Sequence, residues 1–279
     1  MAIAHTVKAN GADIPAIGLG TWPMKGEACS AAVAYALQAG YRHIDTAAFY
    51  GNEDAVGAGL KASGIARSEY FLTTKVWKDD IAPGALERSA EASLGRLGVS
   101  HVDLLLIHWP NPEVAMADCI GALEAAKRAG YAKHIGVSNF TTRLLAEALA
   151  VAKEPLVCNQ VEYHPHLSQA KLMPAVRRAG MALVSYCPLG RGDVGGVMGE
   201  AVVKDIAAKH GRSEAQIVLR WHVQQDGVVA IPKSATPERI RANLDVFNFA
   251  LSAAEMSALS ALARPNGRVV NLAHAPVWD

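Results

Sequence analysis

One structural unit recurs along this chain: a helical pattern ends in Ala-Gly and runs directly into an apolar stretch. The unit appears in LQAGYRHIDT (37–46), KRAGYAKHIGVSN (127–139) and RRAGMALVSYCP (177–188). A glycine just past a helix end suits the left-handed backbone conformation in which many helices terminate. Because helices that alternate with strands typically cover a parallel sheet, the repeat predicts an α/β fold.

Short runs of strand-forming residues continue this alternation along the whole chain. Eight such runs, separated by helical patterns, favour a parallel sheet that closes as a (β/α)8 barrel, or TIM barrel. The length of 279 residues suits one barrel, and no Pro/Ser-rich linker divides the chain, so we predict a single domain over 1–279. The predicted strands are 16–20, 41–45, 71–76, 102–107, 133–137, 157–161, 182–186 and 228–231.

The two ends of the chain fall outside the alternation. TVKANGADIP (6–15) predicts an N-terminal β-hairpin that turns at Asn10-Gly11 and is not one of the eight strands. RPNGRVVNLAHAPVWD (264–279) has turn residues but no hydrophobic period. It predicts an extended C-terminal tail that lies over one end of the barrel and covers the substrate.

Composition limits the classes of partner. The chain has 27 basic and 26 acidic residues, so charge gives no reason to expect nucleic acid or an anionic membrane. No apolar run approaches the roughly 18 residues of a membrane span, and the start lacks a signal-peptide pattern. The four cysteines form no C-x-x-C pair, which indicates reduced thiols. We therefore expect a cytoplasmic protein without a zinc site.

Four polar side chains follow predicted strands at the end of a barrel where chemistry takes place. YRHIDTAAFYGNE (41–53) ends a strand with Asp45 and places Tyr50 in the next loop, while Lys75 and His108 follow the third and fourth strands. Each has an ordinary explanation alone: Asp45 as a helix-entry residue, His108 as a hydrogen-bonded core histidine. Their coincidence at one rim favours a catalytic site.

These groups suit the delivery of a proton to a carbonyl oxygen. A phenol has a pKa of about 10, and a nearby ammonium is expected to lower the pKa of Tyr50. A carboxylate at Asp45 would keep a buried Lys75 charged. His108 could orient the carbonyl oxygen. Reduction of a carbonyl to an alcohol needs such a proton donor, with hydride from a cofactor.

Tryptophans collect at the same predicted rim. Trp22, Trp77 and Trp109 follow strands, and Trp278 lies in the tail. Aromatic side chains around a few polar groups are typical of a small-molecule site, although tryptophans that merely cap the barrel are the alternative. We predict a substrate pocket formed by Trp22, Phe49, Trp77, Trp109 and Trp278.

Eight motifs in order make the interpretation specific: GTW, HIDTAAFYGNE, LTTKVW, DLLLIHWP, IGVSNF, NQVEYHP, SYCPLGRG and IPKSATPERIRANL. Over essentially its whole length the chain resembles the aldo-keto reductases, near the bacterial 2,5-diketogluconate reductase-like members. The resemblance implies a catalytic tetrad of Asp45, Tyr50, Lys75 and His108, with Tyr50 as the acid. It also implies a monomer.

The same resemblance implies a nicotinamide cofactor. A phosphate at a helix start, flanked by Lys and Arg, is favourably placed, so NADPH is expected to be preferred over NADH. Ala242 departs from the acid that many relatives carry near the adenine. The implied contacts are Ser138, Asn139 and Gln160 to the carboxamide, Tyr186 under the ring, Leu189, then Lys233, Ser234 and Arg239 around the 2′-phosphate, and Asn243 near the adenine.

The function thus implied is NADPH-dependent reduction of aldehydes and ketones, with keto-sugar acids, methylglyoxal or simple aldehydes as substrates. Two other functions stay open. A Schiff-base aldolase would use Lys75 as its nucleophile, but Asp45 argues against the uncharged amine that this needs. A nonenzymatic regulatory subunit of the same fold would keep the NADPH site and bind a partner protein. The intact tetrad favours catalysis.

Three shorter patterns carry less weight. GAGLKA (57–62) and GRGDVG (190–195) both match G-x-G-x-x-[GA], but the first lies in a helical pattern. After the second only one strand signal remains, too few for a doubly wound sheet. The resemblance instead gives that loop a place over the cofactor's pyrophosphate. HPH (164–166) suggests a metal site but lacks a third ligand of suitable spacing, so we expect no metal ion.

Overall fold

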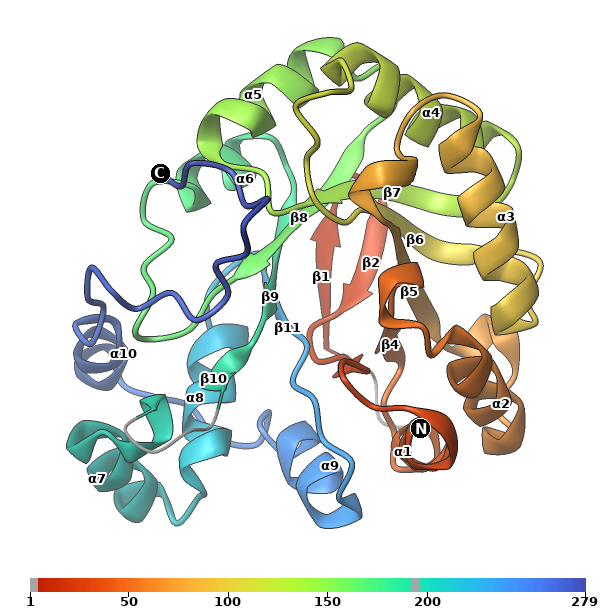
Figure 1. Ribbon diagram of the computed structural model, residues 1–279. Coiled ribbons are helices and arrows are strands. Elements are labelled where there is room, and N and C mark those ends of the chain that lie inside the picture. Colours follow the sequence, from red (N-terminus) through yellow and green to blue (C-terminus); the bar gives the residue numbers. More distant parts are fainter. Residues whose placement is uncertain (1–4, 192–195) are drawn as a thin grey trace.

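The computed structural model describes residues 5–191 and 196–279 as a barrel of strands surrounded by helices (Figure 1). Eight parallel strands follow the order β11-β9-β8-β7-β6-β5-β4-β3. The sheet closes because Ile17 forms a parallel bridge with Ala230, and the amide of Gly20 donates to the carbonyl of Pro232 at 3.0 Å. The predicted (β/α)8 barrel is therefore confirmed.

The strands lie close to their predicted positions. The main difference is the first, predicted over 16–20, which is regular only over its last two residues because residues 16–18 bond to the last strand through an isolated bridge. The barrel strands are β3 (Leu19–Gly20), β4 (His43–Asp45), β5 (Phe71–Val76), β6 (Val102–Ile107), β7 (Ala132–Ser138), β8 (Leu156–Glu162), β9 (Ala182–Tyr186) and β11 (Val228–Ala230), and β10 (Pro188–Arg191) follows β9.

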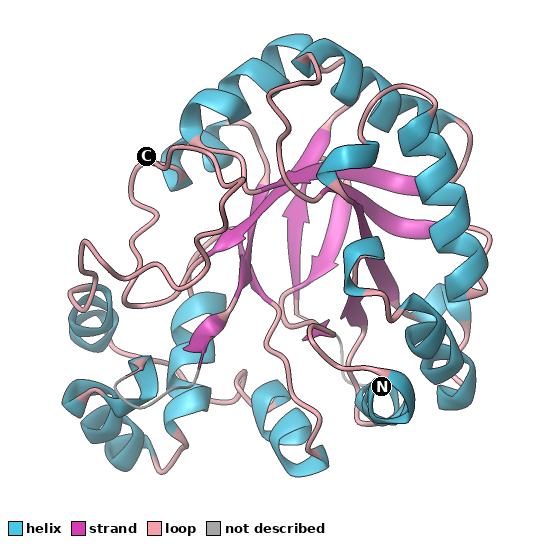
Figure 2. Ribbon diagram, viewed as in Figure 1, coloured by secondary structure: helices cyan, strands magenta, loops and turns pink. Residues whose placement is uncertain are grey.

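Helices form the outer ring, as Figure 2 shows. They are α1 (Gly26–Gln38), α2 (Glu53–Ser63), α3 (Ala85–Leu97), α4 (Met116–Arg128), α5 (Thr142–Val151), α6 (Met173–Arg178), α7 (Ala201–His210), α8 (Glu214–Val223), α9 (Pro237–Leu244) and α10 (Ala253–Ser260). Short 3₁₀ turns are η1 (Ala48–Tyr50), η2 (Arg67–Glu69), η3 (Lys78–Asp80) and η4 (Val197–Gly199). No helix in the described ranges is long and apolar enough to cross a membrane.

The glycines of the repeated unit adopt the conformation that the sequence predicts. Gly40, Gly130 and Gly180 have φ values of 110°, 82° and 67°, each at the turn between a helix and the next strand. Side chains with a Cβ rarely adopt this region, so glycine ends each helix at little cost. This turn sets the helix-to-strand connection of the barrel.

The predicted hairpin is present, and it closes the N-terminal end of the barrel. β1 (Thr6–Ala9) and β2 (Ala12–Pro15) pair antiparallel across Asn10-Gly11. Ala9, Ala12 and Ile14 pack with apolar side chains inside the barrel. Because this end is filled, the open end for chemistry is the opposite one, where the strands finish.

The fold also settles where the two glycine-rich stretches lie. Residues 57–62, the GAGLKA match, lie inside α2 and cannot form a strand-to-helix phosphate loop. Residues 192–195 of the GRGDVG match lie outside the described residues.

Candidate active site

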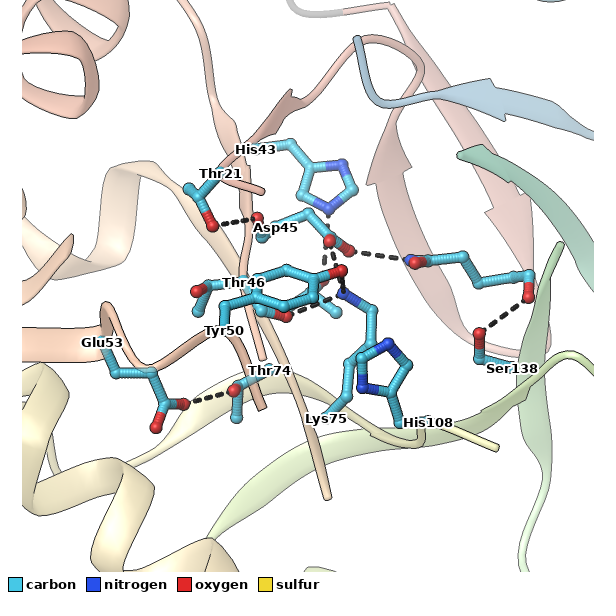
Figure 3. A network of polar contacts seen from close by, with 12 residues as sticks. Thr21, His43, Asp45, Thr46, Tyr50, Glu53, Thr74, Lys75, His108 and Ser138 are labelled. Atoms are coloured by element: carbon cyan, nitrogen blue, oxygen red, sulfur yellow. Dashed lines mark hydrogen bonds and ion pairs between the residues drawn. The ribbon is translucent and has the colours of Figure 1, made fainter. Parts of the chain in front are cut away.

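Strand alternation delivers the tetrad to the barrel interior. Along β6, Leu104 and Leu106 belong to the interior apolar cluster, and His108 continues the same face two residues later. Successive side chains of a strand point to opposite faces, so the same period places Asp45 at the end of β4 and Lys75 near the end of β5 on that face. The structure thus brings these predicted residues together (Figure 3).

The ammonium of Lys75 is the centre of the site. Lys75 is fully buried, and its Nζ donates to Asp45 Oδ1 at 2.5 Å, to the carbonyl of Thr46 at 2.7 Å and to Tyr50 Oη at 3.3 Å. A lysine ammonium has three donors, so all of them are used. Tyr50 accepts one of these bonds, which leaves its own O–H to point elsewhere.

Electrostatics keep both Lys75 and Tyr50 protonated. Burial lowers the pKa of Lys75, but Asp45 and Tyr50 raise it more, and the net pKa lies above its ordinary value. Burial raises the pKa of Tyr50, and Lys75 opposes this only in part. The expected net lowering of the Tyr50 pKa is therefore wrong, because loss of hydration outweighs the ammonium. An ammonium is not a nucleophile, which also disfavours the aldolase alternative.

His108 is uncharged and faces Tyr50. Burial, together with Lys75 and then His274, holds the pKa of His108 well below its ordinary value. Its ring meets the Tyr50 ring edge-on, with centroids 5.5 Å apart. The imidazole Nδ1 is buried without a hydrogen-bond partner among the described residues. A neutral imidazole beside a protonated phenol can hydrogen-bond a carbonyl oxygen.

The residues expected at the nicotinamide also lie together. Ser138 Oγ donates to the carbonyl of Gln160 at 2.8 Å, and Tyr186 Oη donates to Asn139 Oδ1 at 2.8 Å. Asn139 has a φ of 64°, and its Nδ2 donates to the carbonyl of His108 at 2.9 Å. This network ties the ends of β6, β7, β8 and β9 together. Leu189 lies three residues beyond Tyr186 in β10, half-buried against the outer core.

Gln160 makes a contact that sequence reasoning missed. Its Nε2 donates to Asp45 Oδ2 at 2.8 Å, on the carboxylate oxygen opposite the one bound by Lys75. Gln160 therefore joins the residues expected at the nicotinamide to the tetrad. Inward alternation along β8 was the available signal, but the partner is 115 residues away in sequence.

The predicted phosphate residues surround the start of α9. Ser234 is buried and its Oγ accepts from the amide of Thr236 at 3.2 Å, while Asn243 is buried within the helix. Lys233 and Arg239 are exposed, and neither forms an ion pair with another described residue. The first turn also carries one acid, Glu238, so Lys233 and Arg239 leave a net positive charge there. This charge, together with the N–H groups of the first turn, suits an anion.

Aromatic side chains form one continuous series of ring contacts beside the tetrad, which we call the aromatic wall. It includes all five predicted pocket residues and adds His274 from the tail. Trp22 and Phe49 are 48% and 49% exposed, so the aromatic wall begins at an apolar surface. Successive centroids are separated by 5.2 Å (Trp22–Tyr50), 5.5 Å (Tyr50–His108), 5.3 Å (His108–Trp77), 5.2 Å (Trp77–His274), 5.1 Å (His274–Trp109) and 6.0 Å (Trp109–Trp278), and Phe49 stacks on Trp77 at 3.8 Å.

Comparison with known proteins identifies the family. The family model described as "Aldo/keto reductase family" matches residues 16–264. The chain belongs to the aldo/keto reductase family. It is 42% identical over 262 residues to the glyoxal reductase of Bacillus subtilis (strain 168), across 93% of both chains. A solved protein provisionally assigned as 2,5-diketo-D-gluconic acid reductase B shares 45% identity and a TM-score of 0.95, covering 99% of this chain and 98% of its own.

A more distant aldo/keto reductase shows the cofactor class. The Bombyx mori enzyme, solved in complex with NADP, is 32% identical with a TM-score of 0.90, and the match covers 98% of this chain and 96% of that one. The resemblance read from the motifs is thus confirmed. As an aldo/keto reductase, the chain is an oxidoreductase that acts on carbonyl compounds, which favours catalysis over the regulatory alternative.

The tail of this aldo/keto reductase is fixed to the barrel by a buried acid. Glu162, at the end of β8, is fully buried, and its carboxylate accepts from the amides of Val269 at 2.7 Å and Val270 at 2.8 Å. Arg268 lies 3.6 Å from the centroid of the Trp278 ring. Sequence reasoning missed Glu162, although it shares the inward face of β8 with Gln160.

The HPH stretch has structural partners. His164 Nε2 lies 2.9 Å from Glu162 Oε1, and His166 Nε2 lies 2.7 Å from Glu200 Oε1. Within the described ranges, no group of three or more His, Cys, Asp or Glu side chains could hold a metal ion.

Proposed function

We propose that this protein reduces small polar aldehydes and ketones to alcohols with NADPH, with Tyr50 as the proton donor. The observation that carries the proposal is the saturated ammonium of Lys75, whose third donor goes to Tyr50 Oη. The phenol accepts from Lys75, so its own proton is available to a substrate oxygen. Candidate substrates are keto-sugar acids, methylglyoxal and simple aldehydes.

Each member of the tetrad has a distinct task in this proposal. Asp45 keeps Lys75 charged, and Lys75 stabilises the negative charge that develops on Tyr50 as its proton leaves. His108, being neutral, hydrogen-bonds the carbonyl oxygen and orients it toward Tyr50. The aromatic wall would hold the apolar part of the substrate.

The chain's residues fit an NADP cofactor. NADPH supplies the hydride when it is bound. We assign Ser138, Asn139, Gln160 and Tyr186 to the nicotinamide, where their mutual hydrogen bonds fix the side chains beside the tetrad. Leu189 would add an apolar contact. We assign Lys233, Ser234 and Arg239 to the 2′-phosphate and Asn243 to the adenine. The net positive charge at the start of α9 supports NADPH over NADH.

Replacing Arg239 with Ala is expected to weaken NADPH binding about tenfold, because one charge-assisted hydrogen bond to the phosphate is lost. The Kd for NADH should change by less than about twofold, because NADH lacks that phosphate. Fluorescence titration of each cofactor measures both values. Arg143→Ala, an exposed arginine on α5 paired with Glu147, serves as the control. Equal weakening of NADPH and NADH binding would contradict the assignment.

The proposed function is tested by titrating the protein with NADPH and NADH and then adding methylglyoxal or another carbonyl compound. We expect tighter binding of NADPH and oxidation of NADPH only after the carbonyl is added. Binding without turnover on a broad panel of carbonyls would overturn the reductase proposal in favour of a regulatory role.

We further propose that residues 1–279 form one monomeric domain in the cytoplasm. Cys29, Cys119 and Cys158 are buried free thiols, which suits a reducing compartment. Two exposed aromatic side chains, Trp22 and Phe49, lie beside the tetrad and are accounted for by substrate binding.

A further inference from the structure

His274 extends the aromatic wall from the tail toward the tetrad. Its ring meets Trp77 and Trp109 edge-on, with centroids 5.2 Å and 5.1 Å away, and Trp77 in turn meets the His108 ring at 5.3 Å. His274 is therefore one ring away from the imidazole that faces the reacting carbonyl. Asp279 helps to hold this part of the tail, because its carboxylate accepts from the amide of Thr142 at 2.8 Å.

The imidazole of His274 has an unused hydrogen-bonding atom. Its Nε2 is buried and has no partner among the described residues, and the same is true of His108 Nδ1. A buried polar atom left unpaired lowers stability, so such atoms are uncommon unless something else satisfies them. Both of these atoms lie on rings that contact Trp77, and of the two rings His108 also contacts the proton donor Tyr50. This pairing points to a ligand with more than one oxygen.

The surroundings of His274 select an uncharged oxygen. Burial, with a further contribution from Lys78, lowers the pKa of His274, so the ring is neutral at pH 7. Lys78 is neutralised by Asp79 at 2.5 Å, and the nearby guanidinium of Arg268 faces Trp278 and Glu162. A carboxylate would lose hydration here, and both nearby cations already have an acid as partner. A carbonyl or hydroxyl oxygen needs only one hydrogen bond.

We infer that His274 is a specificity-determining residue that hydrogen-bonds an uncharged oxygen on the carbon next to the reacting carbonyl. The enzyme therefore prefers 2-oxo aldehydes to alkanals of the same length. This inference rests on the proposed function, because it requires the reacting carbonyl to lie at Tyr50 and His108. It also ranks the candidate substrates: an uncharged dicarbonyl stands above a keto acid.

Methylglyoxal and propanal test the inference, since they share three carbons and differ in the oxygen at the second carbon. For His274→Phe we expect kcat/KM for methylglyoxal to fall about tenfold or more, with a change below about threefold for propanal. Phenylalanine keeps the ring contacts with Trp77 and Trp109 but has no nitrogen. His274→Gln, which restores a polar group near the Nε2 position, should recover part of the loss.

The control is His101→Phe, because His101 lies at the opposite end of the barrel, just before β6. It should change neither rate. NADPH binding, measured by fluorescence, should be the same in His274→Phe as in the wild type. Equal losses for both aldehydes, or no loss for methylglyoxal, would overturn the inference alone. A wild-type enzyme that reduces neither aldehyde nor any other carbonyl would overturn the proposed function and the inference with it.

Discussion

Replacing Tyr50 with Phe is expected to lower kcat/KM for every carbonyl substrate by about 10²–10⁴, the contribution typical of one positioned acid. The phenyl ring keeps its contacts with Trp22 and His108 but has no proton to give. NADPH affinity should stay within about twofold, because Tyr50 is not among the residues assigned to the cofactor. Steady-state kinetics and a fluorescence titration measure the two effects separately.

A tyrosine outside the site provides the matched control. Tyr131 lies half-buried just before β7, at the closed end of the barrel, and Tyr131→Phe should leave turnover unchanged. If Tyr50→Phe reduced carbonyls at the wild-type rate, the assigned mechanism would be overturned. Equal losses in the two variants would instead indicate a general effect on folding.

The pH dependence should follow the direction of the Tyr50 pKa. Burial raises this pKa above its ordinary value, so the phenol is protonated throughout the neutral range. The rate of carbonyl reduction should therefore hold steady across neutral pH and fall only on the alkaline side, as the proton donor is lost. A rate that instead fell toward acidic pH with the titration of Tyr50 would contradict Tyr50 as the proton donor.

The fold and the tetrad were predictable because they depend on local patterns. The helix–glycine–strand repeat fixes the alternation, and the period of two along each strand places Asp45, Lys75 and His108 on the interior face. The C-terminal ends of parallel strands then meet at one rim. Each of these steps needs only residues close in sequence, and each is visible in the printed chain.

Contacts between distant segments were not predictable in this way. The hydrogen bond from Gln160 to Asp45 spans 115 residues, and those from the amides of Val269 and Val270 to Glu162 span 107 and 108. No local pattern specifies which interior acid meets which partner. The net direction of the Tyr50 pKa was also out of reach, because it depends on how much hydration the folded site removes.

Replacing Asp45 with Asn is expected to destabilise the fold by about 3–5 kcal/mol, because it leaves a buried ammonium without its counter-ion. Lys75 and Asp45 are 0% and 1% exposed, so water cannot compensate. The free energy of unfolding in urea measures the loss. Asp54→Asn, which changes an exposed acid on α2, should cost less than about 1 kcal/mol.

The double variant Asp45→Asn/Lys75→Met separates the lost attraction from the stranded charge. Methionine keeps an unbranched stem of similar length but carries no charge. If the single variant is unstable because the ammonium is uncompensated, the double variant should be more stable than Asp45→Asn alone. A double variant that lost the sum of the two single effects would mean that the two residues act independently. That result would remove Asp45 from its proposed role.

The pH dependence of stability, compared between the wild type and Asp45→Asn, tests the direction in which Asp45 shifts the Lys75 pKa. In the wild type the folded Lys75 pKa lies above the unfolded one, so its stabilisation is complete below the unfolded value of about 10.4 and is lost as pH rises through the folded pKa. In Asp45→Asn, burial remains without the carboxylate, and the folded pKa should fall below the unfolded one. The unfolded chain then binds more protons, so this variant should gain stability as pH rises from about 6 to about 9. A wild-type protein with the same slope would show that Asp45 does not hold the charge on Lys75.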